Sequence, residues 1–167
     1  MSRFERLSRE RDIQSFTSGN TDLDSWLRDA AITADRAGTA RVYLWLDDTE
    51  RVIGYYAVVP HGIRREDVPS SVGRGAPDVI PGFLLARLAL SEELHGQHLG
   101  GDLLVEALTT ILDAIRLASG RVIVVDAIDD RARGFYEHFG FRSLPLNDDR
   151  LVMKASTAAA TLSIDWP

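Results

Sequence analysis

The feature that most constrains the fold is a glycine-rich turn at residues 94–104, with the sequence LHGQHLGGDLL. It follows an apolar run at residues 82–90, which is typical of a strand covered on both faces. Residues 100–119 come next, with apolar side chains at the spacing of a buried helical stripe. The start of such a helix presents unpaired backbone N–H groups and partial positive charge. The turn therefore predicts a phosphate-binding site, with a purely structural turn as the alternative.

The other patterns predict an α/β fold with a mixed sheet of six to seven strands and about four helices. Helices are expected at residues 21–34, 100–119 and 131–139. Strands are expected at residues 4–7, 40–46, 51–59, 82–90, 122–127, 141–144 and 150–154. Pro60 is expected to stop the third strand, and residues 61–82 have the composition of a long irregular segment, either a binding loop or a solvated connection.

Composition excludes several classes of function. The net charge of −6 argues against a general nucleic-acid binder, and the absence of cysteine excludes thiolate chemistry and cysteine-ligated metals. No apolar run is long enough for a membrane span, so we expect a cytoplasmic protein with no metal and no membrane contact. The only lysine, Lys154, lies outside any P-loop pattern, and no dinucleotide-binding pattern follows an early strand.

Three segments together resemble the Gcn5-related N-acetyltransferase (GNAT) family. They are the strand at 83–90, the turn at 94–104 and residues 126–141, which contain the element F-Y-x-x-x-G-F. The resemblance implies a single GNAT-like domain over residues 1–155, followed by a tail at 156–167, that moves an acetyl group from acetyl-CoA to a primary amine.

The family's coenzyme motif, [QR]-x-x-G-x-[GA], falls on residues 95–100. His95 replaces the first Gln or Arg, and His98 replaces the middle glycine. A histidine at that middle position would be strained if the turn required a positive φ there.

The resemblance also implies roles for individual residues. The backbone of the strand end would pair with the pantetheine arm, and N–H groups of residues 96–101 would hold the pyrophosphate. Tyr136 would protonate the leaving thiolate as a general acid, with a packed core aromatic as the alternative. The coenzyme-binding set is Leu88, Ala89, Leu90, His95, Gly96, Gln97, His98, Leu99, Gly100, Gly101 and Phe135.

The residues that receive the amine are less defined. Glu92, Glu93 and Asp126 are candidate bases acting through water, with solvated or capping roles as alternatives. Arg87 interrupts an apolar strand, so it needs either an ion-pair partner or a substrate or coenzyme contact. With Tyr55 and Asp126, Arg87 forms the candidate substrate set, whereas His61 and His138 are expected at the surface.

Residues 16–27, FTSGNTDLDSWL, are similar to the opening of acetyltransferase toxins of type II toxin–antitoxin modules. This resemblance implies acetylation of the α-amino group of aminoacyl-tRNA, a ribbon–helix–helix antitoxin as partner, and a homodimer. Two alternatives stay open. The acidic charge favours an acetyltransferase of a small-molecule or protein amine, and His95 and His98 favour a non-catalytic coenzyme-binding module.

Overall fold

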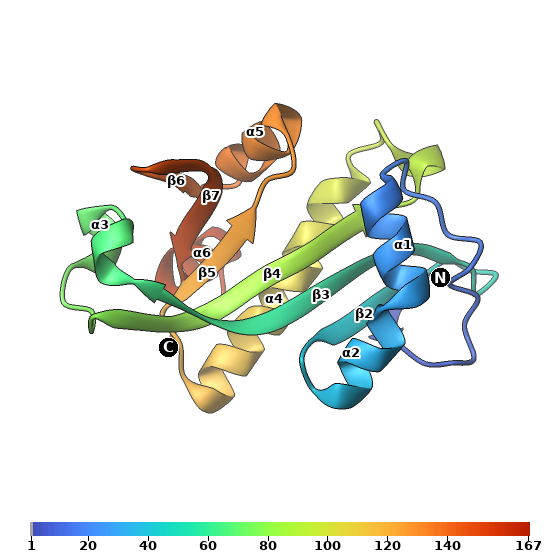
Figure 1. The fold of residues 1–167 in the computed structure, drawn as a ribbon, viewed down its shortest axis with the longest axis horizontal. Coiled ribbons are helices and arrows are strands. Elements are labelled where there is room, and N and C mark those ends of the chain that lie inside the picture. Colours follow the sequence, from blue (N-terminus) through green and yellow to red (C-terminus); the bar gives the residue numbers. More distant parts are fainter. Residues whose placement is uncertain (1) are drawn as a thin grey trace. The chain divides into compact units, whose positions relative to one another are not determined.

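The computed structural model describes residues 2–167 and confirms the α/β class (Figure 1). The described residues form a mixed sheet of seven strands, hydrogen-bonded in the order β1-β2-β3-β4-β5-β7-β6, and six α-helices, where about four were expected. The strands are β1 (Arg3–Arg6), β2 (Arg41–Leu46), β3 (Val52–Arg64), β4 (Val79–Leu90), β5 (Val122–Asp126), β6 (Arg142–Leu144) and β7 (Asn147–Lys154). The helices are α1 (Thr21–Asp29), α2 (Ala31–Ala37), α3 (Ser70–Gly73), α4 (Leu99–Ala118), α5 (Asp130–His138) and α6 (Ala155–Thr161), with short 3-10 turns η1 (Arg65–Asp67) and η2 (Glu92–Leu94). No helix within residues 2–167 is both long and apolar enough to cross a membrane.

The chain forms two compact units. Unit 1 comprises Met1–Val59 and Ala86–Ala107, and unit 2 comprises Pro60–Leu85 and Leu108–Pro167. In unit 1, β1 pairs antiparallel with β2, and β2 pairs antiparallel with β3. Helices α1 and α2 bury Leu27 and Ala31 against the β2 side chains Val42 and Leu44, which forms the core of this unit.

The expected helix at 21–34 is in fact two helices. Asn20 caps α1, its side-chain oxygen accepting the Leu23 N–H at 2.9 Å. The helix breaks at Ala30, whose φ is −124°, and α2 then runs to a left-handed Gly38. Alanine is a good helix former, so no local signal in the sequence marks this break.

The segment similar to the toxin opening has a structural explanation. The buried carboxylate of Asp24 accepts hydrogen bonds from the Ser18 backbone N–H at 2.9 Å and from the Ser18 hydroxyl at 2.6 Å. Gly19 between them has a φ of +88°, which favours glycine. Phe16 and Leu27 are buried in the core of unit 1. These residues therefore fix the loop that leads into α1.

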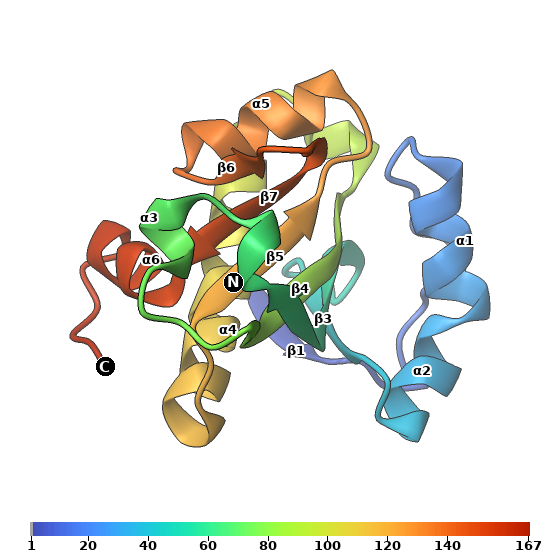
Figure 2. The ribbon, with the colours of Figure 1, turned by 60° about the vertical axis from the view of Figure 1, so that its left-hand side comes forward.

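In unit 2, β4 pairs parallel with β5, and β5 pairs antiparallel with β7. Gly82 of β4 lies opposite Val122, so close that a Cβ added to Gly82 would lie 2.2 Å from the Val122 carbonyl oxygen. Figure 2 shows α5 lying along the β6–β7 hairpin. The segment expected as a tail begins with α6, which buries Ala155, Ala158 and Ala159.

The prediction that Pro60 ends the third strand is wrong. β3 continues through Pro60 to Arg64, because the φ that the proline ring imposes is compatible with extended backbone. Residues 61–82 are therefore not one irregular segment. They contain the end of β3, η1, α3 and the start of β4. Val68, Val72, Ala76 and Ile80 from this segment are buried in the core of unit 2.

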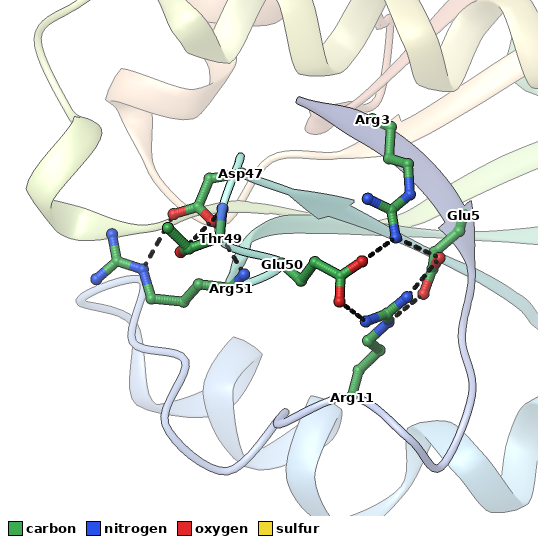
Figure 3. A network of polar contacts seen from close by, with 7 residues as sticks. All are labelled: Arg3, Glu5, Arg11, Asp47, Thr49, Glu50 and Arg51. Carbon is green, nitrogen blue, oxygen red and sulfur yellow. Dashed lines mark hydrogen bonds and ion pairs between the residues drawn. The ribbon is translucent and has the colours of Figure 1, made fainter. Parts of the chain in front are cut away.

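An ion-pair network joins β1, the following loop and the β2–β3 turn in unit 1 (Figure 3). Glu50 accepts hydrogen bonds from Arg3 at 2.9 Å and from Arg11 at 3.2 Å. Arg11 also donates two hydrogen bonds to Glu5, one of them at 3.1 Å. The hydrogen bond from Arg11 lowers the pKa of Glu5, and that from Arg3 lowers the pKa of Glu50. The folded state therefore holds fewer protons on these carboxyls than the unfolded chain.

From these pKa shifts we expect stability to fall in acid. The contribution of Glu5 is fully present above its ordinary pKa of 4.5 and is lost as the pH falls through the lower folded value. Urea unfolding from pH 7 to pH 3 should show a smaller loss of stability for Glu5→Gln than for the wild type. Asp113→Asn, at an exposed position of α4, serves as the matched control and should follow the wild type. Parallel pH profiles for Glu5→Gln and the wild type would contradict the assignment.

Candidate active site

The glycine-rich turn lies in unit 1 between β4 and α4. The Ser91 N–H donates to the Ile53 carbonyl at 2.8 Å, and the Glu92 N–H donates to the Thr17 carbonyl at 3.0 Å. His95 Nε2 lies 2.9 Å from the Leu90 carbonyl oxygen. Because a carbonyl oxygen only accepts, His95 donates this bond from Nε2. The side chain of His95 therefore ties the turn to the end of β4.

Two residues of the turn have a left-handed backbone. Gly96 has a φ of +81°, and a Cβ added there would meet no atom within 4 Å. His98 has a φ of +61° immediately before α4 begins at Leu99. The family motif has glycine at the position of His98, and the structure shows why, since a side chain there adds strain of about 1 kcal/mol. Gln97 completes this segment, and its amide donates to the Glu93 carbonyl at 3.4 Å.

The strand before the turn has a backbone that extends beyond its ladder with β5. Among the described residues, this ladder runs from Gly82 opposite Val122 to Leu85 opposite Val125. Leu88, Ala89 and Leu90 follow it; Ala89 is buried, and its two neighbours are half-buried. On the β3 side, a Cβ added to Gly54 would lie 3.3 Å from the Ala89 carbonyl oxygen. The resemblance implies that a pantetheine arm pairs with the backbone of this last part of β4, beyond the residues that pair with β5.

Arg87 has an aromatic partner rather than an ion-pair partner. Its guanidinium carbon lies 5.1 Å from the centre of the Trp26 ring, and the described residues show no carboxylate within ion-pair distance. Trp26 in turn stacks on Tyr55 with ring centres 6.2 Å apart. A cation over an indole ring is stabilised by the ring quadrupole, which accounts for the half-buried arginine without a counter-ion.

Tyr55 is held in the core of unit 1. Its hydroxyl donates to the Leu23 carbonyl at 2.6 Å, and its side chain is fully buried. Burial raises the pKa of Tyr55, and the nearby charge of Arg87 partly offsets the rise. Tyr55 is therefore packed in the core, and its hydroxyl hydrogen is already used in the hydrogen bond to Leu23.

Tyr136 lies on α5 in unit 2. The helix is capped by Asp129, whose side chain accepts the Ala132 N–H at 2.8 Å. The Tyr136 ring contacts Phe135 and Phe141 edge to face at 5.4 and 5.7 Å, and the residue is 8% exposed. Burial, with a smaller effect from the charge of Asp126, raises the pKa of Tyr136 above its ordinary 10. The phenol is therefore protonated at neutral pH and can donate a proton.

Asp126 ends β5, directly opposite Arg150 on β7. Its two carboxylate oxygens accept hydrogen bonds from Arg150 Nε at 2.7 Å and Nη2 at 2.8 Å. Arg150 Nη1 also lies 3.2 Å from His61 Nε2. His61 was expected at the surface but is only partly exposed, because it packs against Arg150. The sequence carries no signal for this cluster, since β3, β5 and β7 supply one residue each.

The other candidate bases lie in unit 1. Glu93 is ion-paired with Arg51. Glu92 and Glu93 line an open cavity of about 160 Å³ together with Asp12 and Arg51. No group of three or more potential metal ligands occurs within residues 2–167.

Comparisons with known proteins place these features in a family. No protein-family model matches the chain. A curated tRNA-acetylating toxin of Mycobacterium tuberculosis is 35% identical over 157 residues, which cover 94% of both chains. AtaT complexed with acetyl-methionyl-tRNAfMet has a TM-score of 0.88 at 24% identity, covering 97% of this chain and 99% of that one. A Tyr-to-Phe mutant of the AtaT toxin, bound to acetyl-CoA and the C-terminus of the antitoxin AtaR, has a TM-score of 0.82 at 24% identity, covering 97% and 98%.

The fold is that of the GNAT acetyltransferases, as the resemblance implied. The identity with the mycobacterial protein over nearly its whole length goes further: the chain belongs to the family of tRNA-acetylating toxins, and it is an acetyl-CoA-dependent acetyltransferase.

Proposed function

We propose that this protein transfers the acetyl group of acetyl-CoA to the α-amino group of an aminoacyl-tRNA, and that it thereby blocks translation as a toxin. The observation that carries the proposal is the 35% identity to a tRNA-acetylating toxin over 94% of both chains. The acceptor itself is supported by AtaT, which has been solved with acetyl-methionyl-tRNAfMet.

The turn before α4 is the proposed pyrophosphate site. The left-handed backbone at Gly96 and His98 interrupts the regular secondary structure between β4 and α4. Successive backbone N–H groups can therefore point toward one anion. The dipole of the 20-residue helix α4 adds positive charge at the same end. Gln97, Leu99, Gly100 and Gly101 would contribute backbone N–H groups to this site.

Tyr136 is the proposed general acid. The neutral α-amine attacks the thioester carbonyl carbon, the C–S bond breaks, and the leaving thiolate takes the proton of the Tyr136 hydroxyl. The amine nitrogen loses its own proton to solvent, and the Tyr136 phenolate regains a proton from solvent, which leaves an amide, a free thiol and the enzyme in its starting state. The protonated state of Tyr136 at neutral pH supports this role, because a donor must carry its proton when the bond breaks.

The backbone of His98 gives a prediction for coenzyme binding. Replacing His98 with valine should raise the Kd for acetyl-CoA about 10-fold, because a β-branched side chain is strongly disfavoured at a φ of +61°. His98→Asn is the matched control, since asparagine tolerates the left-handed region, and its Kd should stay within about 3-fold of the wild type. Isothermal titration calorimetry measures both. Equal affinities for the valine and asparagine variants would show that the turn does not need this conformation.

The test of the proposed function is transfer of label from radioactive acetyl-CoA to total aminoacyl-tRNA. Deacylated tRNA and a panel of small amines serve as parallel acceptors. Label on aminoacyl-tRNA that deacylated tRNA does not acquire would support the proposal. Label on the small amines alone, with coenzyme binding intact, would replace it with a small-molecule acetyltransferase.

An antitoxin partner is part of the same proposal. AtaT has been solved with the C-terminus of its antitoxin AtaR. We propose a ribbon–helix–helix antitoxin for this protein and a homodimeric state for the toxin. Growth arrest on expression that is relieved by the neighbouring gene, and a dimer mass by light scattering, would be the expected results.

A further inference from the structure

Unit 1 contains an open cavity of about 160 Å³ that the proposed acetyl transfer does not use. Its lining comes from the loop before α1, from Arg51 and Val52 at the start of β3, and from residues 91–93 after β4. The Glu92 N–H donates to the Thr17 carbonyl at 3.0 Å, so the first and last of these segments are joined. A cavity of about 150 Å³ can hold a molecule of the size of benzene. A small organic group therefore fits here.

The cavity is acidic. Asp12, Glu92 and Glu93 line it together with one guanidinium group, that of Arg51. Arg51 is already paired with Glu93 and lies 3.4 Å from Asp47 (Figure 3). The Glu92 carboxylate, in contrast, makes no hydrogen bond or ion pair with any residue between 2 and 167. The charge of the lining therefore favours a cation over an anion.

Ser91 adds a hydrogen-bonding group that the fold itself does not use. The residue is 8% exposed and lines the cavity. Its backbone N–H donates to the Ile53 carbonyl at 2.8 Å, but its hydroxyl has no hydrogen-bond partner within residues 2–167. A serine hydroxyl accepts up to two hydrogen bonds and donates one. Ser91 can therefore accept an N–H from a ligand in the cavity.

The apolar part of the lining indicates which kind of cation fits. Phe16 and Val52 are buried, and the Phe16 ring is packed edge to face against Tyr55 with ring centres 5.8 Å apart. A guanidinium group is planar, is more weakly hydrated than an ammonium group and stacks on aromatic rings. It also donates several N–H bonds in a fixed fork, which suits a carboxylate next to a hydroxyl. The lining therefore favours guanidinium over ammonium.

We propose that this cavity binds the guanidinium group of an arginine side chain from a partner polypeptide. The volume accommodates the head group and part of its stem, and the open mouth leaves the partner's main chain outside. The net charge of −6 favours the approach of a basic partner. The inference goes beyond the proposed function, because it concerns binding at a second place in unit 1 and not acetyl transfer.

The first test is a titration with methylguanidinium, followed by nitrogen-15 NMR of the labelled protein at low salt. The amide signals of Thr17, Ser91 and Glu92 should shift in a saturable way, with a Kd of about 1–10 mM. Glu92→Gln should raise the Kd about 10-fold, and Ser91→Ala should raise it about 3-fold. Glu10→Gln is the matched control, because it removes an exposed carboxylate of unit 1 outside the cavity and should bind like the wild type.

An equal Kd for Glu92→Gln and the wild type would overturn the proposal, and so would the absence of shifts at the three amides. Glu92 is exposed, so its replacement should leave the melting temperature unchanged and the comparison free of folding effects. The label-transfer assay tests the proposed function separately, so failure of one does not imply failure of the other.

Two further ligands test the kind of cation and its source. N-acetylarginine methylamide represents an arginine within a polypeptide and should bind at least as tightly as methylguanidinium. n-Butylammonium has the same charge and the same number of non-hydrogen atoms as methylguanidinium, and it should bind about 5-fold more weakly. Binding of methylguanidinium without binding of the arginine derivative would indicate a site for a free small guanidine. Tighter binding of n-butylammonium would indicate a site for lysine or a polyamine. Either result would overturn the proposal.

Discussion

Replacing Tyr136 with phenylalanine is expected to lower kcat for acetyl transfer about 100- to 1,000-fold, because the leaving thiolate loses its proton donor. The change removes one oxygen atom and keeps the ring, which packs between Phe135 and Phe141. The affinity for acetyl-CoA and the melting temperature should therefore stay close to those of the wild type. A general acid acts on the transition state, so kcat should carry the loss rather than KM.

The measurement is single-turnover transfer from acetyl-CoA to aminoacyl-tRNA at several pH values. Burial holds the pKa of Tyr136 above 10, so titration of this phenol should cause no loss of wild-type rate between about pH 6 and 9. Tyr43→Phe, which removes a phenol hydroxyl on β2 of unit 1, is the matched control and should retain full activity. A Tyr136→Phe variant within about 3-fold of the wild type would remove the acid role and leave Tyr136 a packed aromatic.

The second large effect is expected at Gly82, where alanine should destabilise the fold by about 3 kcal/mol or more. A Cβ at Gly82 would lie 2.2 Å from the Val122 carbonyl oxygen and 2.7 Å from a Val122 methyl group. The obstacle is backbone within the parallel β4–β5 ladder, so no side-chain rotation relieves it. For a chain of this length, the midpoint of thermal unfolding should fall by about 6–12 °C.

Gly134→Ala is the matched control for this prediction. Gly134 lies inside α5, and a Cβ added there would meet no atom within 4 Å. Because alanine is the better helix former, the change should raise stability by about 0.5–1 kcal/mol. Calorimetry should therefore show a lower melting temperature for Gly82→Ala and a higher one for Gly134→Ala, although both variants add a single methyl group. A fall in stability at Gly134 as large as that at Gly82 would show that the ladder contact is not the cause.

The elements with strong periodicity could be predicted from the sequence, and those decided by tertiary packing could not. The apolar stripe of α4 and the β-branched run of β5 gave bounds within a residue or two of the observed ones. The break between α1 and α2 at Ala30 and the continuation of β3 through Pro60 were missed. Local chemistry favours the opposite outcome at both places, since alanine continues a helix and proline usually ends a strand.

The candidate site likewise has a part that could be predicted from the sequence and a part that could not. The turn at residues 95–98 and the aromatic cluster around Tyr136 follow from motifs that are contiguous in the chain. The Asp126–Arg150–His61 cluster does not, because its members are separated by up to 89 residues and meet through strand register. The partner of Arg87 could not be predicted either, because Trp26 is distant in the sequence and an arginine in an apolar strand indicates only that some partner is needed.

The points at which the chain passes from one unit to the other restrict how its gene can evolve by recombination. It crosses at Val59 to Pro60, at Leu85 to Ala86 and at Ala107 to Leu108. These crossings lie inside β3, β4 and α4 rather than in linkers, where boundaries between exchangeable modules normally fall. Recombination at any of these three points would transfer a gene segment that encodes an incomplete strand or an incomplete helix. Toxins of this architecture are therefore expected to diversify by substitution and by loop insertion, and not by shuffling one unit for another.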